Sequence, residues 1–84
     1  MYKVYLIKSL KDGNYYIGQT NDIENRLKQH NQGKVRSTKS RTPFVLLGTE
    51  EYQTQNETRY REYQLKNKPS LKKRFISKFE NENK

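Results

Sequence analysis

Apolar and aromatic residues open the chain in a pattern typical of two paired strands. Residues 2–7 are rich in aromatic and β-branched side chains, which favour extended structure. An Asp12-Gly13 pair follows, and this dipeptide is a strong signal for a tight hairpin turn. Residues 15–18 are again aromatic and β-branched, as a return strand would be. The pattern therefore predicts a β-hairpin at the start of the chain.

A helical period replaces this pattern shortly after the hairpin. Ile23, Leu27 and His30 are spaced i, i+4, i+7, so they share one face of a helix. Asn21 is a suitable N-cap, with a glutamate three residues later as in a capping box. Gly33 stands three residues after His30, and glycine is the residue that commonly follows the end of a helix. We predict a helix over residues 22–32.

The second half of the chain predicts one more strand and two more helices. The third strand is expected to open at Pro43 and to run to about Tyr52, because this segment is rich in β-branched and apolar residues. A full capping box at residues 54–57 predicts the start of a second helix. That helix should end near Asn67, since Pro69 disfavours helical geometry at the residue before it.

The last helix is predicted by a stripe of apolar residues. Leu71, Phe75 and Phe79 follow one another at intervals of four and give this helix one apolar face. Residues 80–84 are polar, and we expect them to fray as a tail. The order β-β-α-β-α-α predicts an α+β fold, in which helices pack on a small antiparallel sheet. We expect a single domain over residues 1–79.

Composition limits the class of protein. Of the 84 residues, 30% are hydrophobic and none is cysteine, so disulfides and thiolate metal sites are excluded. Such a polar, charged composition is close to that of disordered chains, but the mutually consistent local signals favour a folded domain. We find neither an apolar run of 18 residues nor a signal-like N-terminus. We therefore expect a cytoplasmic protein that does not enter a membrane.

Positive charge is concentrated in two stretches of the chain. Lysine and arginine number 18 against nine acidic residues, which gives a net charge of +9. Residues 27–48 contain no acidic residue and include a polar, cationic loop at residues 34–42. Residues 59–78 contain eight basic residues and a single acid, Glu62. A solvated charged face is the plain alternative, but so large an imbalance favours binding to nucleic acid over an acidic protein or a membrane surface.

Glu62 is the first candidate for chemistry. Thr58, Glu62 and Leu65 are spaced i, i+4, i+7, so the carboxylate is expected to point partly toward the sheet. Mg²⁺ is often held by one or two protein carboxylates together with substrate phosphates, so one carboxylate is sufficient. An ion pair with Arg59 or Lys66 on the helix surface is an equal alternative.

Four further residues could act on a phosphodiester. Arg26 and His30 lie four apart on the first helix, where they could grip a phosphate and move a proton. Taken singly, a packed histidine and a solvated arginine are the simpler interpretations. Tyr5 and Tyr16 lie on the paired strands, and either could serve as a base if cations lowered its pKa from about 10.

Together these residues resemble the GIY-YIG nuclease superfamily. The likeness is greatest to short stand-alone bacterial proteins similar to the nuclease domain of the bacterial excinuclease, and it runs over about residues 2–75. The matching positions are Lys3-Val4-Tyr5 and Tyr16-Ile17-Gly18 for the two signature motifs, Arg26 and His30 for the R-L-x-x-H segment, and Glu62 for the helix with the family's metal-binding glutamate.

The resemblance implies a three-stranded antiparallel sheet flanked by helices and a metal-dependent cleavage of DNA. Carried over, Glu62 would hold Mg²⁺ or Mn²⁺, and Arg26 would bind the scissile phosphate. Tyr5, Tyr16 or His30 would activate or orient water, and Gly18 would let the backbone turn tightly beside the site. The expected nucleic-acid contacts are Lys28, Lys34, Arg36, Ser37, Thr38, Lys39, Arg41 and Lys66.

We therefore expect a divalent-metal-dependent DNA endonuclease, nicking or structure-specific, of the kind used in DNA repair or recombination. Its expected partner is branched, damaged or single-stranded DNA. A nucleic-acid-binding module with little or no turnover is the alternative, and a protein-interaction module is a third. So small a surface predicts weak sequence specificity, because phosphate contacts position a protein without reading bases.

Overall fold

The structure is a computed structural model that describes residues 1–82. Its elements are β1 (Tyr2–Ser9), β2 (Tyr15–Thr20), α1 (Ile23–Asn31), the 3₁₀ turn η1 (Lys39–Arg41), β3 (Phe44–Tyr52), α2 (Gln55–Asn67) and α3 (Pro69–Glu82). The predicted order β-β-α-β-α-α and the α+β class are confirmed. Within this described part, every helix is too short or too polar to cross a bilayer.

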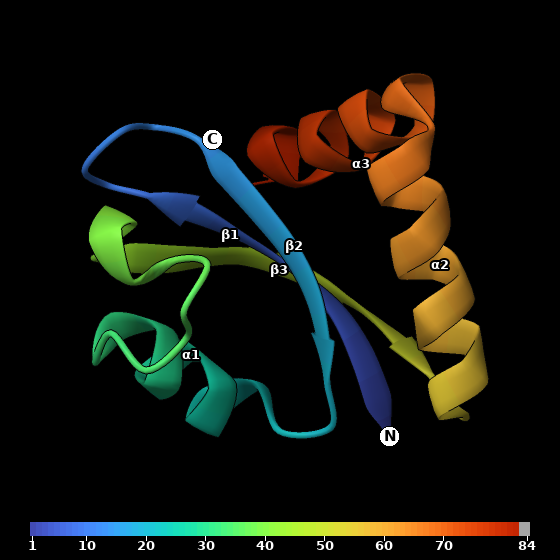
Figure 1. The fold of residues 1–84 in the computed structure, drawn as a ribbon. Helices are drawn as coiled ribbons and strands as arrows, with labels where there is room; N and C mark the ends of the chain where they lie inside the picture. The colour runs from blue at the N-terminus through green and yellow to red at the C-terminus, as the bar shows by residue number, and fades with distance from the viewer. Residues whose placement is uncertain (83–84) are drawn as a thin grey trace.

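The three strands form one antiparallel sheet in the order β2-β1-β3 (Figure 1). The first strand is therefore the central one, and it pairs with its hairpin partner on one side and with β3 on the other. In this register Tyr5 lies directly opposite Gly18 on β2 and Thr49 on β3. The central strand thus has its backbone groups satisfied on both sides, as a buried position requires.

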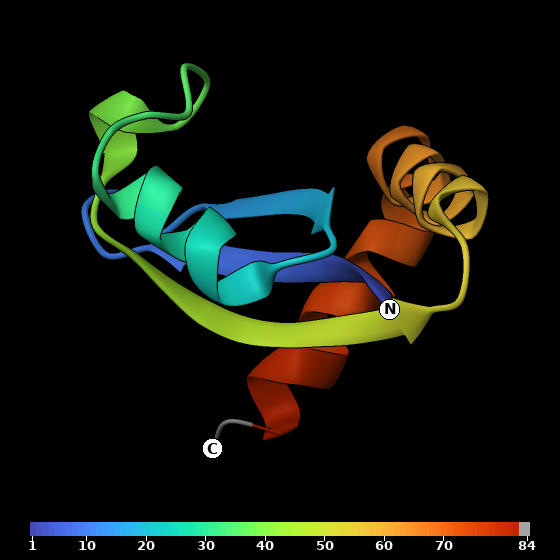
Figure 2. The same cartoon turned by 90° about the horizontal axis from the view of Figure 1, so that it is seen from below.

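Alternation along β1 divides the core into two layers. Val4 and Leu6 point to one face, where they pack with residues of α2 and α3: Leu65, Phe75 and Phe79. Tyr5 and Ile7 point to the opposite face, where they pack with Phe44 and with residues of α1. Figures 1 and 2 show α1 on one side of the sheet and α3 on the other, with α2 standing beside the sheet. Each layer buries apolar surface, which drives folding.

The ends of α1 are fixed by local hydrogen bonds. Asp22, rather than the expected Asn21, is the N-cap, and its carboxylate accepts a hydrogen bond from the Asn25 N–H at 3.1 Å. At the other end Gly33 takes a positive φ of 74° and donates its N–H to the His30 carbonyl at 3.1 Å. Glycine tolerates this left-handed conformation without steric cost. The caps hold the helix that carries Arg26 and His30.

The last helix is longer than expected. We predicted that residues 80–84 would fray, but α3 continues to Glu82, and residues 83–84 lie outside the described part of the chain. The Glu80 carboxylate accepts a hydrogen bond from the Tyr15 hydroxyl at 2.9 Å and lies 3.5 Å from the Lys8 ammonium. These contacts with the hairpin anchor the last turn, and the polarity of the segment gives no local sign of them.

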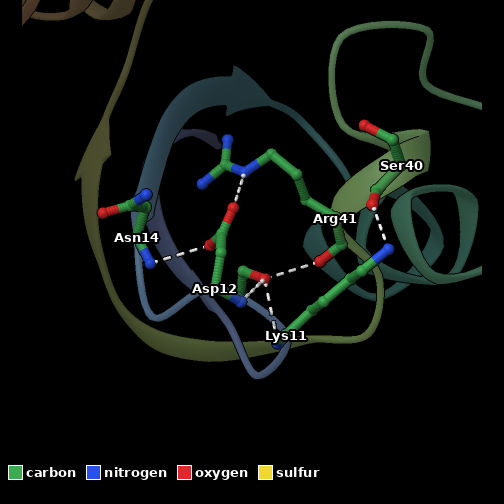
Figure 3. Close-up of polar contacts among 6 residues, drawn as sticks. Lys11, Asp12, Asn14, Ser40 and Arg41 are labelled. Carbon is green, nitrogen blue, oxygen red and sulfur yellow. Dashed lines mark hydrogen bonds and ion pairs between the residues drawn. The ribbon is translucent and has the colours of Figure 1, made fainter.

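The cationic loop between α1 and β3 is fastened to the hairpin turn (Figure 3). Arg41 donates to the Asp12 carboxylate at 2.8 Å, and Lys11 donates to the Ser40 carbonyl at 3.1 Å. The buried Ser9 hydroxyl donates to the Arg41 carbonyl at 2.6 Å. Residues we expected to be a plain loop are therefore held in place, and η1 forms within them.

Candidate active site

Tyr5 stands at the centre of the face that α1 covers, and its side chain is 1% exposed. Gly18 faces it across the strands, and a Cβ at this position would overlap the Tyr5 phenol. We expected Gly18 to permit a tight turn, but it lies within β2 and is not among the glycines with positive φ. The missing side chain instead provides the space that the Tyr5 ring occupies.

His30 connects Tyr5 to the loop. Its Nε2 lies 2.8 Å from the Tyr5 hydroxyl, and its Nδ1 lies 2.8 Å from the Thr38 hydroxyl. Thr38 can donate its own proton to the Val35 carbonyl at 3.4 Å, which leaves its oxygen to accept from Nδ1–H. Nε2 is then the acceptor for the Tyr5 O–H. The network thus assigns one tautomer to a neutral imidazole.

The burial of these two side chains shifts both of their pKa values. Burial raises the pKa of Tyr5 to about 12, and the hydrogen bond from Arg26 offsets part of this rise. Burial also lowers the pKa of His30 to about 4, helped by the nearby positive charge of Arg26. Desolvation disfavours the charged form of each group. At neutral pH the resting site therefore holds a protonated phenol and an uncharged imidazole.

Arg26 approaches this pair from the surface. It is half-buried, its Nε lies 3.4 Å from the Tyr5 hydroxyl, and its Nη1 donates to Gln29 at 3.1 Å. The contact with Tyr5 is longer than a typical N–H···O bond, so little is lost if the guanidinium turns to another acceptor. The arginine can therefore bind an anion placed over Tyr5.

Tyr16 lies on the same face and links α1 to α2. Its ring centroid is 5.2 Å from that of His30 and 6.4 Å from that of Tyr5. The Lys66 ammonium lies 5.4 Å from the centre of the Tyr16 ring, a cation–π contact. Tyr16 is half-buried, whereas Tyr5 and His30 are buried. Of the three expected bases it is the most accessible.

Glu62 lies on the inner side of α2, where Thr58 and Leu65 are fully buried as the spacing predicted, and its partner Lys66 connects it to Tyr16. Its side chain is 20% exposed, and Oε1 accepts a hydrogen bond from Lys66 at 3.0 Å. Oε2 is buried and has no hydrogen-bond partner within residues 1–82. Both alternatives from the sequence are thus partly realised, since one oxygen is paired and the other is free.

A free buried carboxylate oxygen suits a hard divalent cation, which prefers oxygen ligands. In residues 1–82 there is no group of three or more histidine, cysteine, aspartate or glutamate side chains that could hold a metal ion. Glu62 is therefore the side chain that could bind the ion, and water or substrate oxygens would complete the coordination. The residues present fit such an ion.

The residues expected to contact nucleic acid are mostly on the surface. Side chains of Lys28, Lys34, Arg36, Ser37, Lys39 and Lys66 are exposed. Arg41 is half-buried and paired with Asp12, so its charge is already partly neutralised. Thr38 requires a correction, because it is fully buried against His30 and offers no surface to a DNA strand.

The role of Thr38 was not visible in the sequence. A serine–threonine pair within a cationic loop carries no periodicity, so nothing local indicates which hydroxyl turns inward. The contact arises because the loop is fastened to the hairpin and returns past the end of α1. We propose that Thr38 positions the imidazole of His30.

Comparison with known families decides the relationship. Residues 1–81 match the family model described as the GIY-YIG catalytic domain. The chain belongs to the GIY-YIG family. The resemblance seen in the motifs is thereby confirmed, and this GIY-YIG chain is assigned to a family of nuclease domains.

Proteins named UPF0213 are similar to this GIY-YIG chain. One from Halobacterium salinarum is 40% identical over 67 residues, which cover 79% of this chain and 86% of the relative. Another from Bacillus subtilis is 40% identical over 70 residues, covering 82% and 70% respectively. The solution NMR structure of a UPF0213 protein from Bacillus halodurans has 34% identity and a TM-score of 0.57, covering 92% of this chain and 84% of its own. The shared name states no activity.

Proposed function

We propose that this protein is a divalent-metal-dependent endonuclease that hydrolyses DNA phosphodiester bonds in the cytoplasm, by nicking or by recognising DNA structure. The observation that carries the proposal is the free, buried Oε2 of Glu62 on the site that also contains Arg26, Tyr5 and His30. A phosphodiester needs charge neutralisation, an activated water and a stabilised leaving group, and this set of groups can supply each of them.

Arg26 binds the scissile phosphate. Its guanidinium lies beside the Tyr5 hydroxyl at 3.4 Å and can donate to two phosphate oxygens at once. When it turns to the phosphate, the Tyr5 hydroxyl becomes available to a water molecule. The positive charge also offsets the negative charge that grows on the phosphate oxygens during attack.

Tyr5 and His30 move the proton. As the attacking water gives a proton to the Tyr5 oxygen, the original hydroxyl proton of Tyr5 passes to His30 Nε2, 2.8 Å away. No free phenolate is needed, which matters because burial raises the pKa of Tyr5 to about 12. Thr38 keeps Nε2 free for this step by holding the other ring nitrogen in its protonated form.

Glu62 would hold Mg²⁺ or Mn²⁺ through its free oxygen. Such an ion, when bound, would polarise the phosphate and stabilise the leaving oxygen. Lys66, now bonded to the other oxygen of Glu62, would keep the carboxylate oriented or move to a phosphate. Tyr16, under the Lys66 ammonium, forms the wall of the site beside them.

The test is a nicking assay on supercoiled, flapped and branched DNAs with Mg²⁺, with Mn²⁺ or with a chelator. We expect cleavage only with metal, and we expect Glu62→Gln and Arg26→Ala each to lower the rate by about 100-fold or more, as removal of a charge-stabilising group typically does. The matched control is Glu51→Gln, which changes an exposed carboxylate of β3 that pairs with Lys3 of β1. It should cleave at the wild-type rate.

An active Glu62→Gln variant would contradict this mechanism. A wild-type protein that binds DNA with steep salt dependence, but cleaves none of these DNAs with either metal, would instead identify a binding module on the same scaffold.

A further inference from the structure

Two tyrosines differ from every other aromatic residue in the chain. The sequence contains seven tyrosines and three phenylalanines, all within the described residues. Eight of these rings are buried or half-buried, whereas Tyr60 and Tyr63 are each 62% exposed. Single exposed apolar residues are ordinary, but two large rings on one helix face need a reason. Both belong to α2, the helix that carries Glu62.

Helical geometry connects the two rings to the edge of the active site, with Tyr63 nearer to Glu62 and Tyr60 farther round the helix. Residues three or four apart on a helix are surface neighbours, so Tyr63 lies next to Tyr60, Arg59 and Lys66. Lys66 in turn contacts the Glu62 carboxylate at 3.0 Å and covers the Tyr16 ring. An exposed surface of two cations and two rings therefore begins at Lys66, the partner of the Glu62 carboxylate, and continues outward along α2.

The charge of this surface indicates its partner. From residue 59 to residue 78 the acid is Glu62 alone, and eight basic residues surround it in sequence. Arg61 is engaged elsewhere, because it pairs with Glu50 at 2.9 Å, but Arg59 and Lys66 are exposed. A second copy of this chain would bring like charges together, which disfavours self-association through this face. Nucleic acid matches this surface, because its phosphates are negatively charged and its bases offer flat ring faces to the two tyrosines.

We infer that Tyr60 and Tyr63 form a stacking platform for unpaired bases of the DNA strand whose phosphate lies at Glu62. Base–aromatic stacking beside a positively charged track is the way proteins bind single strands without reading sequence. In a duplex the same bases are stacked on one another and offer no free face. The inference rests on the proposed function in one respect, since the strand held here is taken to be the strand that is cut.

The test distinguishes binding to bases from binding to phosphates. Binding is measured by fluorescence anisotropy in a chelator, so that cleavage plays no part, using a 15-nucleotide oligothymidine, an abasic strand of the same length and a blunt duplex. The variants are Tyr60→Ala/Tyr63→Ala and Tyr60→Phe/Tyr63→Phe. The control is Leu10→Ala, which removes an equally exposed apolar side chain, also 62%, from the hairpin turn.

We expect the double alanine variant to bind oligothymidine about tenfold more weakly, because a stacked base contributes roughly five- to 150-fold in affinity. Binding of the abasic strand and of the duplex should change less than about twofold. The double phenylalanine variant keeps the rings and should bind like the wild type, as should Leu10→Ala.

The inference would be overturned if the double alanine variant lost as much affinity for the abasic strand or the duplex as for oligothymidine, or if its affinity for oligothymidine did not fall. A change of sedimentation coefficient on the alanine substitutions would also overturn it, since it would make the two rings an interface between copies. These outcomes are independent of the proposed function. Base-dependent binding without any cleavage would support the stacking platform and contradict the proposed function. Cleavage that does not depend on the two rings would support the proposed function and contradict the platform.

Discussion

At the scale of single residues, His30 illustrates how burial decides a protonation state. It is the one histidine in the sequence, and it is fully buried between Tyr5 and Thr38. Burial holds its pKa at about 4, so the folded protein carries it uncharged at neutral pH. A neutral imidazole with one assigned proton can accept from the Tyr5 hydroxyl, which a charged one could not do.

The lowered pKa of His30 predicts a pH-dependent stability. Because the unfolded chain has the ordinary histidine pKa of about 6.5, it takes up the proton first as pH falls, and the folded state is destabilised between about pH 6.5 and pH 4. We expect the free energy of unfolding to fall by about 2 kcal/mol from pH 7 to pH 5. Urea unfolding at each pH measures it.

The control is His30→Gln, which lacks the titrating group and should change by less than about 0.5 kcal/mol over the same interval. Equal pH dependence in wild type and variant would show that other groups are responsible.

At the scale of elements, two glycines set how closely side chains approach the sheet. Gly18 on β2 makes room for the Tyr5 phenol, and Gly48 on β3 makes room for the Phe79 ring of α3. Gly48 lies next to a register shift in the pairing of β1 with β3, between Leu6 and Ile7. One glycine thus serves the active-site layer and the other serves the opposite layer.

Substitutions at these two glycines should distinguish an effect on folding stability from an effect on cleavage. Gly18→Ala and Gly48→Ala should each lower the free energy of unfolding by about 1–3 kcal/mol, the usual result of overpacking. Gly18→Ala should also reduce cleavage per folded molecule, because the added methyl group displaces the Tyr5 hydroxyl from His30. Gly48→Ala is the matched control and should cleave normally below its unfolding temperature. Normal cleavage by Gly18→Ala would show that the position of Tyr5 is not critical.

At the scale of the whole molecule, charge is distributed to favour a polyanion. The net charge is +9, and exposed cations lie on α1 at Lys28, in the loop that follows it, on α2 and on α3. Several cations are instead neutralised in ion pairs, as Lys3 is by Glu51 at 3.5 Å. The unpaired ones determine how strongly DNA binding depends on salt, because each phosphate they neutralise releases counterions.

The salt dependence of binding gives a prediction at this scale. Replacing Lys34 and Arg36 together with alanine should reduce the slope of log affinity against log salt concentration by about 1.4–1.8, since each phosphate contact contributes roughly 0.7–0.9. The loss should be similar for different DNA sequences. Lys3→Ala serves as the control and should leave the slope unchanged, because this lysine is already paired. An unchanged slope in the double variant would place the bound DNA away from the loop.

Local patterns in the sequence were sufficient to predict the helices and strands. Aromatic and β-branched residues around the Asp12-Gly13 turn predicted the hairpin, and the spacing of Ile23, Leu27 and His30 and the capping box at Thr54 predicted the helices that follow. These signals succeed because they depend on neighbours within about one helical turn or one strand. The cap of α1 shifted by one residue to Asp22, since either Asx side chain can reach a free N–H.

The tertiary structure alone decided the contacts between residues that are far apart in the chain. The Tyr5–His30 bond spans 25 positions, and the Thr38 hydroxyl turns inward because its loop is fastened to the hairpin. The free oxygen of Glu62 likewise depends on how α2 meets the sheet. Sequence therefore determined the elements, the total charge and the candidate residues. Packing determined which of those residues meet and which are desolvated, because pKa values and accessibility depend on three-dimensional neighbours.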